Sequence, residues 1–173
     1  MLNTRNFFLL FVLYVNLNSC HTDSFQGTKR YFTTDRTVYK AGEVIKLTAV
    51  IEADEEREIR FYDNYKNLRI NFSAEGGALT YTSDNGTPDT TVTAYTIKPE
   101  HPFEKVFRIY TQERGDSLLL SIPELDYTGV LPSHQILDLG IKLRIGGIAI
   151  PIDAGTGDSL DDYFKAAEVS IVR

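Results

Sequence analysis

The chain has 173 residues, with 18 basic and 24 acidic side chains, one cysteine and no tryptophan. This acidic excess argues against nucleic acid as a partner, because phosphate binding needs clustered lysine and arginine side chains. A single cysteine cannot form a disulfide framework within the chain. We therefore expect a hydrophobic core to hold the fold, and the length suits one domain with such a core.

The N-terminal residues have the three parts of a secretory signal. Arg5 supplies a positive charge, residues 7–15 are apolar, and residues 17–20 read Leu-Asn-Ser-Cys. The apolar run is too short for a membrane-spanning helix, which needs about 20 residues. The order that ends at Cys20 resembles a bacterial lipobox, which implies cleavage before this cysteine and acyl chains such as palmitate on it. An ordinary signal peptide with an unmodified cysteine nearby is the alternative.

This leader divides the chain into three expected parts: a lipoprotein signal peptide at 1–19, a lipidated tether at 20–29 and a single β-sandwich domain at 30–173. From Cys20 onward the chain has 17 basic and 24 acidic residues, a net charge of −7. Two or more acyl chains anchor a protein stably. We expect a bacterial envelope protein, held at the outer membrane, because His21 stands where some bacteria place an inner-membrane retention aspartate.

Between residues 34 and 48 an aromatic residue, two spacers and Gly-Glu precede an alternating strand. Tyr39, Gly42 and Glu43 hold these positions. The pattern resembles the opening of bacterial Ig-like domains, of macroglobulin-type modules and of BsuPI-like proteinase-inhibitor domains. The resemblance implies a β-sandwich in which Tyr39 closes one end of the core and Gly42 permits a turn. It implies a fold and no particular activity.

Alternation of apolar and polar residues dominates the rest of the chain and predicts β-strands. Ile45, Leu47 and Ile51, for example, fall on one face of their segment. Many short strands separated by turn residues are typical of an antiparallel Ig-like β-sandwich. The predicted strands are residues 45–52, 58–62, 68–73, 79–81, 91–97, 105–111, 117–122, 137–145, 148–152 and 168–172.

The turn at residues 63–67 carries the candidate contact with a partner. Tyr65 lies there between Asn64 and Asn67, and an aromatic ring beside two amides suits a protein or glycan partner. Asparagine and aspartate are also favoured in turns for backbone reasons alone. The turn therefore has a second interpretation that needs no ligand.

Two glycines at residues 146–147 separate the alternating runs 137–145 and 148–152. Because glycine supplies the positive φ angles of tight turns, this arrangement predicts a hairpin. Pro151 lacks a backbone donor, so we expect the second strand of this hairpin to lie at an edge of the sheet or to turn its free side to the solvent.

The acidic, glycine-rich stretch at 153–162 is a weak candidate for calcium, with Asp153, Asp158 and Asp161 as oxygen ligands. Its order departs from an EF-hand loop, because Asp158 occupies the place of the required glycine. A solvated loop is the alternative, and we expect no metal or other cofactor. Ser159 followed by Asp162 resembles a capping box ahead of residues 163–167, which predicts one short C-terminal helix.

No catalytic constellation is apparent in the sequence. His21, His101 and His134 lie in the expected tether or in expected loops, and no Gly-x-Ser-x-Gly sequence occurs. We therefore expect a non-enzymatic envelope lipoprotein whose Ig-like body binds a protein or glycan partner or serves as a scaffold. The alternative is an inhibitor or immunity lipoprotein that blocks a hydrolase by inserting a loop.

Overall fold

The computed structural model describes residues 25, 27–74, 81–82, 90–115, 117–132, 140–152 and 163–173, in which almost all regular structure is β-strand. A single turn of 3-10 helix, η1 (Pro123–Leu125), separates β9 from β10. The strands are β1 (Thr28–Thr34), β2 (Val38–Lys40), β3 (Val44–Ala53), β4 (Arg57–Tyr62), β5 (Leu68–Ala74), β6 (Tyr81–Thr82), β7 (Val92–Ile97), β8 (Phe103–Arg114), β9 (Ser117–Ile122), β10 (Tyr127–Pro132), β11 (Ile141–Ala149) and β12 (Tyr163–Val172).

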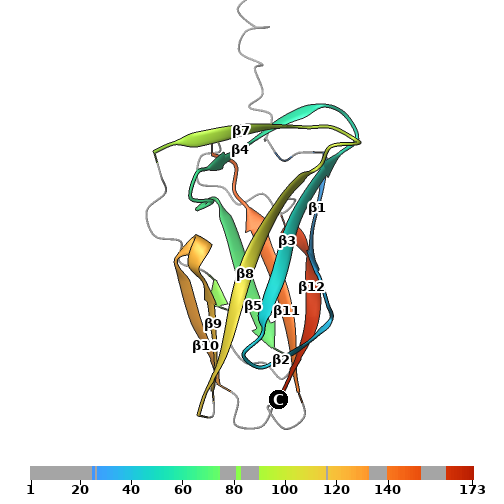
Figure 1. Ribbon diagram of the computed structural model, residues 1–173. Coiled ribbons are helices and arrows are strands. Elements are labelled where there is room, and N and C mark those ends of the chain that lie inside the picture. The colour runs from blue at the N-terminus through green and yellow to red at the C-terminus, as the bar shows by residue number, and fades with distance from the viewer. Residues whose placement is uncertain are drawn as a thin grey trace, which may run out of the picture.

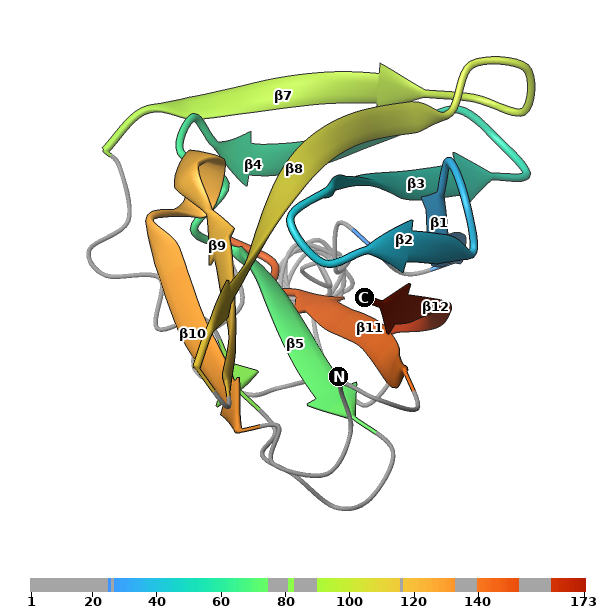
Figure 2. The same ribbon diagram turned by 60° about the horizontal axis from the view of Figure 1, so that its bottom comes forward.

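Ten of these strands form one sheet that curls on itself. Its order is β10-β9-β8-β3-β1-β12-β11-β5-β6, and β2 pairs with the end of β12. Figures 1 and 2 show the two halves of this sheet facing each other as a nearly closed, barrel-like sandwich. Near the open side, the ring of Phe72 on β5 stacks on that of Tyr127 on β10, with 5.5 Å between centroids. β4 and β7 form a separate antiparallel pair across one end of the sandwich (Figure 1).

The core is lined by the apolar residues that alternation placed on one face of each strand. Ile45, Leu47 and Ile51 of β3 are fully buried, which confirms the predicted inner face of this strand. The core extends to Phe25, which is also fully buried and whose ring lies 5.6 Å from that of Phe61. Phe25 belongs to the segment expected to be a tether, and β1 begins within that segment at Thr28. The packed part of the chain therefore includes the end of this segment.

The predicted C-terminal helix is wrong, because residues 163–167 belong to β12. Phe164 and Ala167 of this strand are buried against the core. β12 pairs with β11 on one side and with β1 on the other. These tertiary contacts outweigh the local helical preference of the segment. The pairings of β12 with β1 and β2 are parallel, so the sheet is mixed and not antiparallel throughout.

The hairpin predicted at the two glycines is also wrong. Gly146 and Gly147 lie inside β11, where the pairing with β12 is irregular. A Cβ atom at Gly147 would lie 2.9 Å from the ring of Phe32 and would overlap the carbonyl oxygen of Arg69. Glycine is therefore required for close approach of the neighbouring chain and not for a turn. Pro151 lies beyond the end of this single strand.

Candidate binding groove

A groove of about 520 Å³ lies on the outer face of the sheet formed by β5, β11, β12 and β2. Its floor is formed by the exposed residues that alternate with buried ones along these strands. Leu143 on β11 and Val169 on β12 are buried, so their neighbours Lys142, Arg144 and Glu168 lie on the opposite, exposed face. Among the described residues that line the groove, all except Thr37 belong to strands.

Strand pairing brings the polar side chains of the groove side by side. Arg144 lies opposite Glu168 on β12 and opposite Ser73 on β5. Lys142 lies opposite Ser170. Directly opposite residues of an antiparallel pair have Cβ atoms about 4.5–5.5 Å apart. The five side chains therefore form one connected polar surface.

β2 forms a wall of the groove. Ser170 pairs in parallel with Val38, and the backbone N–H of Ser170 donates to the carbonyl oxygen of Thr37 at 2.8 Å. The side chain of Val38 is 53% exposed. An apolar wall thus stands beside the charged floor.

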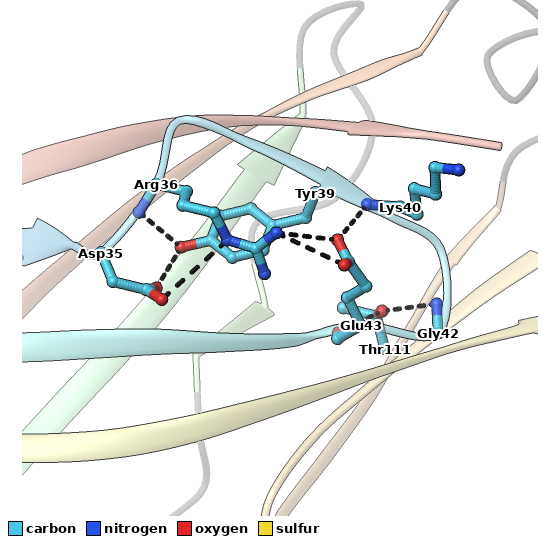
Figure 3. A network of polar contacts seen from close by, with 7 residues as sticks. All are labelled: Asp35, Arg36, Tyr39, Lys40, Gly42, Glu43 and Thr111. Atoms are coloured by element: carbon cyan, nitrogen blue, oxygen red, sulfur yellow. Dashed lines mark hydrogen bonds and ion pairs between the residues drawn. The ribbon is translucent and has the colours of Figure 1, made fainter.

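A network of polar contacts holds the turn before β2 in place (Figure 3). The hydroxyl of Tyr39 donates to Asp35 Oδ1 at 2.6 Å and accepts from the Arg36 N–H at 3.1 Å. The guanidinium of Arg36 lies 4.6 Å from the centroid of the Tyr39 ring. The hydrogen bond from Tyr39 lowers the pKa of Asp35, whereas burial and the same bond raise the pKa of Tyr39. Tyr39 is only 1% exposed, as the resemblance implied.

Glu43 covers the free edge of β2 (Figure 3). The Lys40 N–H donates to Glu43 Oε2 at 2.7 Å, and this bond is the main cause of the lowered pKa of Glu43. The Glu43 N–H donates to the Lys40 carbonyl oxygen at 3.0 Å. Gly42 makes the intervening turn with a φ of 93°, and its N–H donates to Thr111 Oγ1 at 3.0 Å. The side chain and the backbone N–H of Glu43 therefore satisfy the N–H and the carbonyl oxygen of Lys40, which an edge strand otherwise leaves open.

The charges on the groove floor are not neutralised by each other. Arg144 and Glu168 lie opposite one another, yet within the described part of the chain no ion pair or hydrogen bond joins their side chains. Exposed ion pairs contribute little to stability, so the fold itself does not require this pairing. Both groups are directed at the solvent in the groove.

The predicted contact residues lie together on the turn between β4 and β5. Asn67 is only 4% exposed, and its Nδ2 donates to the carbonyl oxygens of Arg60 and Ile150, both at 3.1 Å. The side chain of Asn64 accepts a hydrogen bond from the Lys66 N–H at 3.3 Å. These amides are used within the protein, where they hold the turn against the sandwich.

Tyr65 is half-buried and packs against the core. Its ring lies 5.7 Å from that of Phe61 and 6.0 Å from that of Phe107. The Lys105 ammonium lies 4.4 Å from the centroid of the Tyr65 ring. The Tyr65 hydroxyl shares a hydrogen bond with the Tyr95 hydroxyl at 3.1 Å, which raises the pKa of Tyr95 to about 12. Tyr65 thus joins the β4–β7 pair to β8, although its φ of 53° is unusual for a side-chain-bearing residue.

Several predicted residues lie outside the described part of the chain: Cys20, Asp153, Asp158 and Asp161. Among the residues that the structure describes, no group of three or more His, Cys, Asp or Glu side chains is placed to hold a metal ion. Within the same residues, no helix combines the length and the apolar character needed to cross a membrane.

The groove residues are not singled out by the sequence analysis. Alternation marks Lys142, Arg144 and Glu168 as outward-facing, which is the usual position of a charged residue. Their juxtaposition depends on the pairing of β11 with β12 and of β12 with β2. These segments are distant in sequence, so no local pattern reveals the groove.

No family model matches this chain, and no curated protein matches it. Among solved structures, the sporulation control protein Spo0M from Bacillus subtilis is similar with a TM-score of 0.39 and 11% identity, over 85% of this chain and 50% of that chain. A beta-glucosidase from Listeria innocua in complex with glucose gives a TM-score of 0.36 and 7% identity, over 84% of this chain and 16% of the enzyme. This chain therefore spans half of Spo0M and a small part of the enzyme. The similarities are weak, and they assign no activity.

Proposed function

We propose that this chain is a non-enzymatic, lipid-anchored protein of the bacterial envelope whose β-sandwich body binds its partner in the groove between β2 and β5. The observation that carries this proposal is the groove floor, where Arg144 and Glu168 lie opposite each other without an ion pair. Ligand sites are typically concave and have a few polar groups held by a rigid scaffold. The volume of about 520 Å³ falls in the range of such sites.

The anchor rests on the lipobox-like order that ends at Cys20. Only residues 21–24 separate this cysteine from Phe25, which is buried in the sandwich. An extended residue spans at most about 3.6 Å. A lipid on Cys20 would therefore hold the body close to the membrane surface.

The strand order supports the Ig-like part of the proposal. Ig constant-type domains have strands C, F and G in one sheet and strands A, B, E and D in the other. Here β5, β11 and β12 take the order of C, F and G. β1, β3 and β8 take the order of A, B and E. The β9–β10 hairpin lies beside β8, where an Ig domain has strand D, but it follows β8 along the chain, whereas strand D precedes strand E.

The anchor is tested by mass spectrometry of the mature N-terminus and by fractionation of a Cys20→Ser variant. We expect a chain that begins with acylated Cys20, and a variant that leaves the membrane fraction. An unprocessed leader, or a Cys20→Ser protein that stays in the membrane fraction, would contradict the anchor.

The binding role is tested by pull-down from solubilised envelope with the full-length protein in detergent. We expect a defined protein or glycan to be recovered by the wild type and lost with the double variant Arg144→Gln, Glu168→Gln. Arg114→Gln is the matched control, because Arg114 is exposed on β8, outside the groove. Equal recovery by the wild type and the groove variant would contradict a role for the groove. Inhibition of an enzyme in a protease and lysozyme panel would instead support the inhibitor alternative.

A further inference from the structure

The groove lies on a basic face of an acidic protein. The four strands β2, β5, β11 and β12 contain the cations Lys40, Arg69, Lys142, Arg144 and Lys165, all of which are exposed. Glu168 is the one acidic residue in these four strands. From Cys20 onward the chain has 17 basic and 24 acidic residues. The basic charge is therefore gathered on this face against the net charge of the molecule, which favours an anionic ligand there.

We infer that the groove binds an anionic saccharide, that is, a sugar that carries a carboxylate or a phosphate. This inference rests on the proposed role of the groove as the binding site. Arg144 would receive the anionic group, because its planar guanidinium matches the geometry of both anions. Lys142, two residues away on the same face of β11, adds a second positive charge.

From the presence of Glu168 we infer that the ligand has hydroxyl groups as well as a negative charge. A carboxylate directly opposite Arg144 weakens the attraction of that site for a simple anion. An ionised carboxylate only accepts hydrogen bonds, so it needs a ligand that donates them. Ser73 and Ser170 can both donate and accept. The several hydroxyl groups of a sugar complement this mixture of groups, whereas inorganic phosphate offers only one or two hydroxyl donors on an anion that Glu168 repels.

The lining of the groove is unlike the centre of a protein–protein interface. Such centres are enriched in aromatic residues and depleted of lysine, glutamate and serine. Here the floor consists of Lys142, Arg144 and Glu168 with two serines, and Val38 is the exposed apolar side chain at the wall. A stable protein interface also covers about 800 Å² of each partner. A small polar ligand therefore fits this groove better than a protein surface.

The inference is tested by calorimetric titration of the full-length protein in detergent. The probes are trigalacturonate, which carries carboxylates, glucose 6-phosphate, which carries a phosphate, galactotriose as the neutral sugar, and inorganic phosphate. We expect trigalacturonate or glucose 6-phosphate to bind at least about tenfold more tightly than both galactotriose and inorganic phosphate. The one that binds identifies the anionic group.

Three variants locate the binding. Arg144→Gln should weaken the binding of the acidic sugar by about tenfold or more, because a charge-assisted hydrogen bond is lost. Glu168→Gln should strengthen the binding of inorganic phosphate, because it removes a repulsive charge. It should strengthen the binding of the acidic sugar less or weaken it, because it also replaces a charged acceptor for hydroxyls by a neutral one. Arg114→Gln, outside the groove, should leave the affinity unchanged.

Three results would overturn the inference: failure of both acidic sugars to bind, equal affinity in the wild type and Arg144→Gln, or tighter binding of triglutamate than of either sugar. The last result would indicate an acidic peptide. None of these results depends on lipidation or on recovery of a partner from the envelope. A failure of the saccharide class is therefore distinguishable from a failure of the proposed function.

Discussion

Two clusters of charged residues lie on either side of β2, and they use their charges differently. In the network around Tyr39, Asp35 accepts the tyrosine hydroxyl, and Arg36 bonds both carboxylate oxygens of Glu43. In the groove, Arg144 on β11 lies directly opposite Glu168 on the adjacent strand β12, and no ion pair joins the two side chains. The first cluster satisfies its charges within the protein, whereas Arg144 and Glu168 in the second present theirs to the solvent.

Burial explains this difference. The Tyr39 ring is in the core, and a buried polar group costs free energy unless it is hydrogen-bonded. The hydroxyl of Tyr39 therefore needs its hydrogen bonds, which Asp35 and the Arg36 N–H supply. The groove residues stay hydrated, so their arrangement has little influence on stability and is free to serve binding. Substitutions in the two clusters should separate these roles.

The largest effect is expected for Tyr39→Ala, which should destabilise the protein by about 3–5 kcal/mol, as for other buried aromatic residues. Tyr39→Phe keeps the ring and removes only the hydroxyl, so it should cost about 1 kcal/mol. Equilibrium unfolding in urea measures both values. A loss for Tyr39→Ala no larger than that for Tyr39→Phe would show that the ring is not part of the core.

Asn67→Ala should cost about 2 kcal/mol, because it removes a buried side chain that donates to the carbonyl oxygens of Arg60 and Ile150. The same urea experiment measures it, with Asn64→Ala as the control on the same turn. Asn64 makes one longer hydrogen bond, at 3.3 Å, so its removal should have a smaller effect. Equal effects of the two substitutions would contradict a special role for Asn67.

Acidification should destabilise the network around Tyr39. The pKa values of Asp35 and Glu43 are lowered in the folded protein by hydrogen bonds from Tyr39 and Lys40. Their contribution to stability is therefore present above the unfolded values of about 3.9 and 4.3 and is lost as the pH falls through the lower folded values. The double variant Asp35→Asn, Glu43→Gln should show a flatter decline of stability below about pH 4. A decline as steep as that of the wild type would assign the acid sensitivity to other carboxylates.

The smallest effect on stability is expected for Arg144→Gln, which should change the free energy of unfolding by no more than about 0.5 kcal/mol. Urea unfolding of this variant beside Arg114→Gln tests the expectation. A large loss for Arg144→Gln alone would place Arg144 in the structural cluster and would remove the contrast between the two regions.

The strands that could be predicted are those with one face in the core and one in water. β3 and β9 follow the alternating pattern and lie at the expected positions. β1 was not predicted, because its burial does not alternate cleanly: Phe32 is its one fully buried side chain. This strand joins the two halves of the sheet, where it pairs with both β3 and β12. A strand at such a junction has no simple inner and outer face.

The site could be predicted only as a set of separate surface residues. Tyr39 and Gly42 were identifiable because their roles depend on the local sequence, as the φ of 93° at Gly42 illustrates. The position of Arg144 beside Glu168 depends on the register of two strands separated by residues 150–162. Side-chain alternation fixes the face of a residue, whereas register fixes its neighbour. The groove therefore cannot be predicted from the sequence, because it depends on which strands pair and in which register.

The parallel pairing of Tyr31 on β1 with Lys165 on β12 has a consequence for biosynthesis. It joins the first of the described strands to the last of them, so the sandwich cannot close while β12 is still within the ribosome. Contacts between distant parts of a chain also form slowly. A nascent chain with this topology therefore keeps its sandwich open until β12 has been synthesised and has left the ribosome.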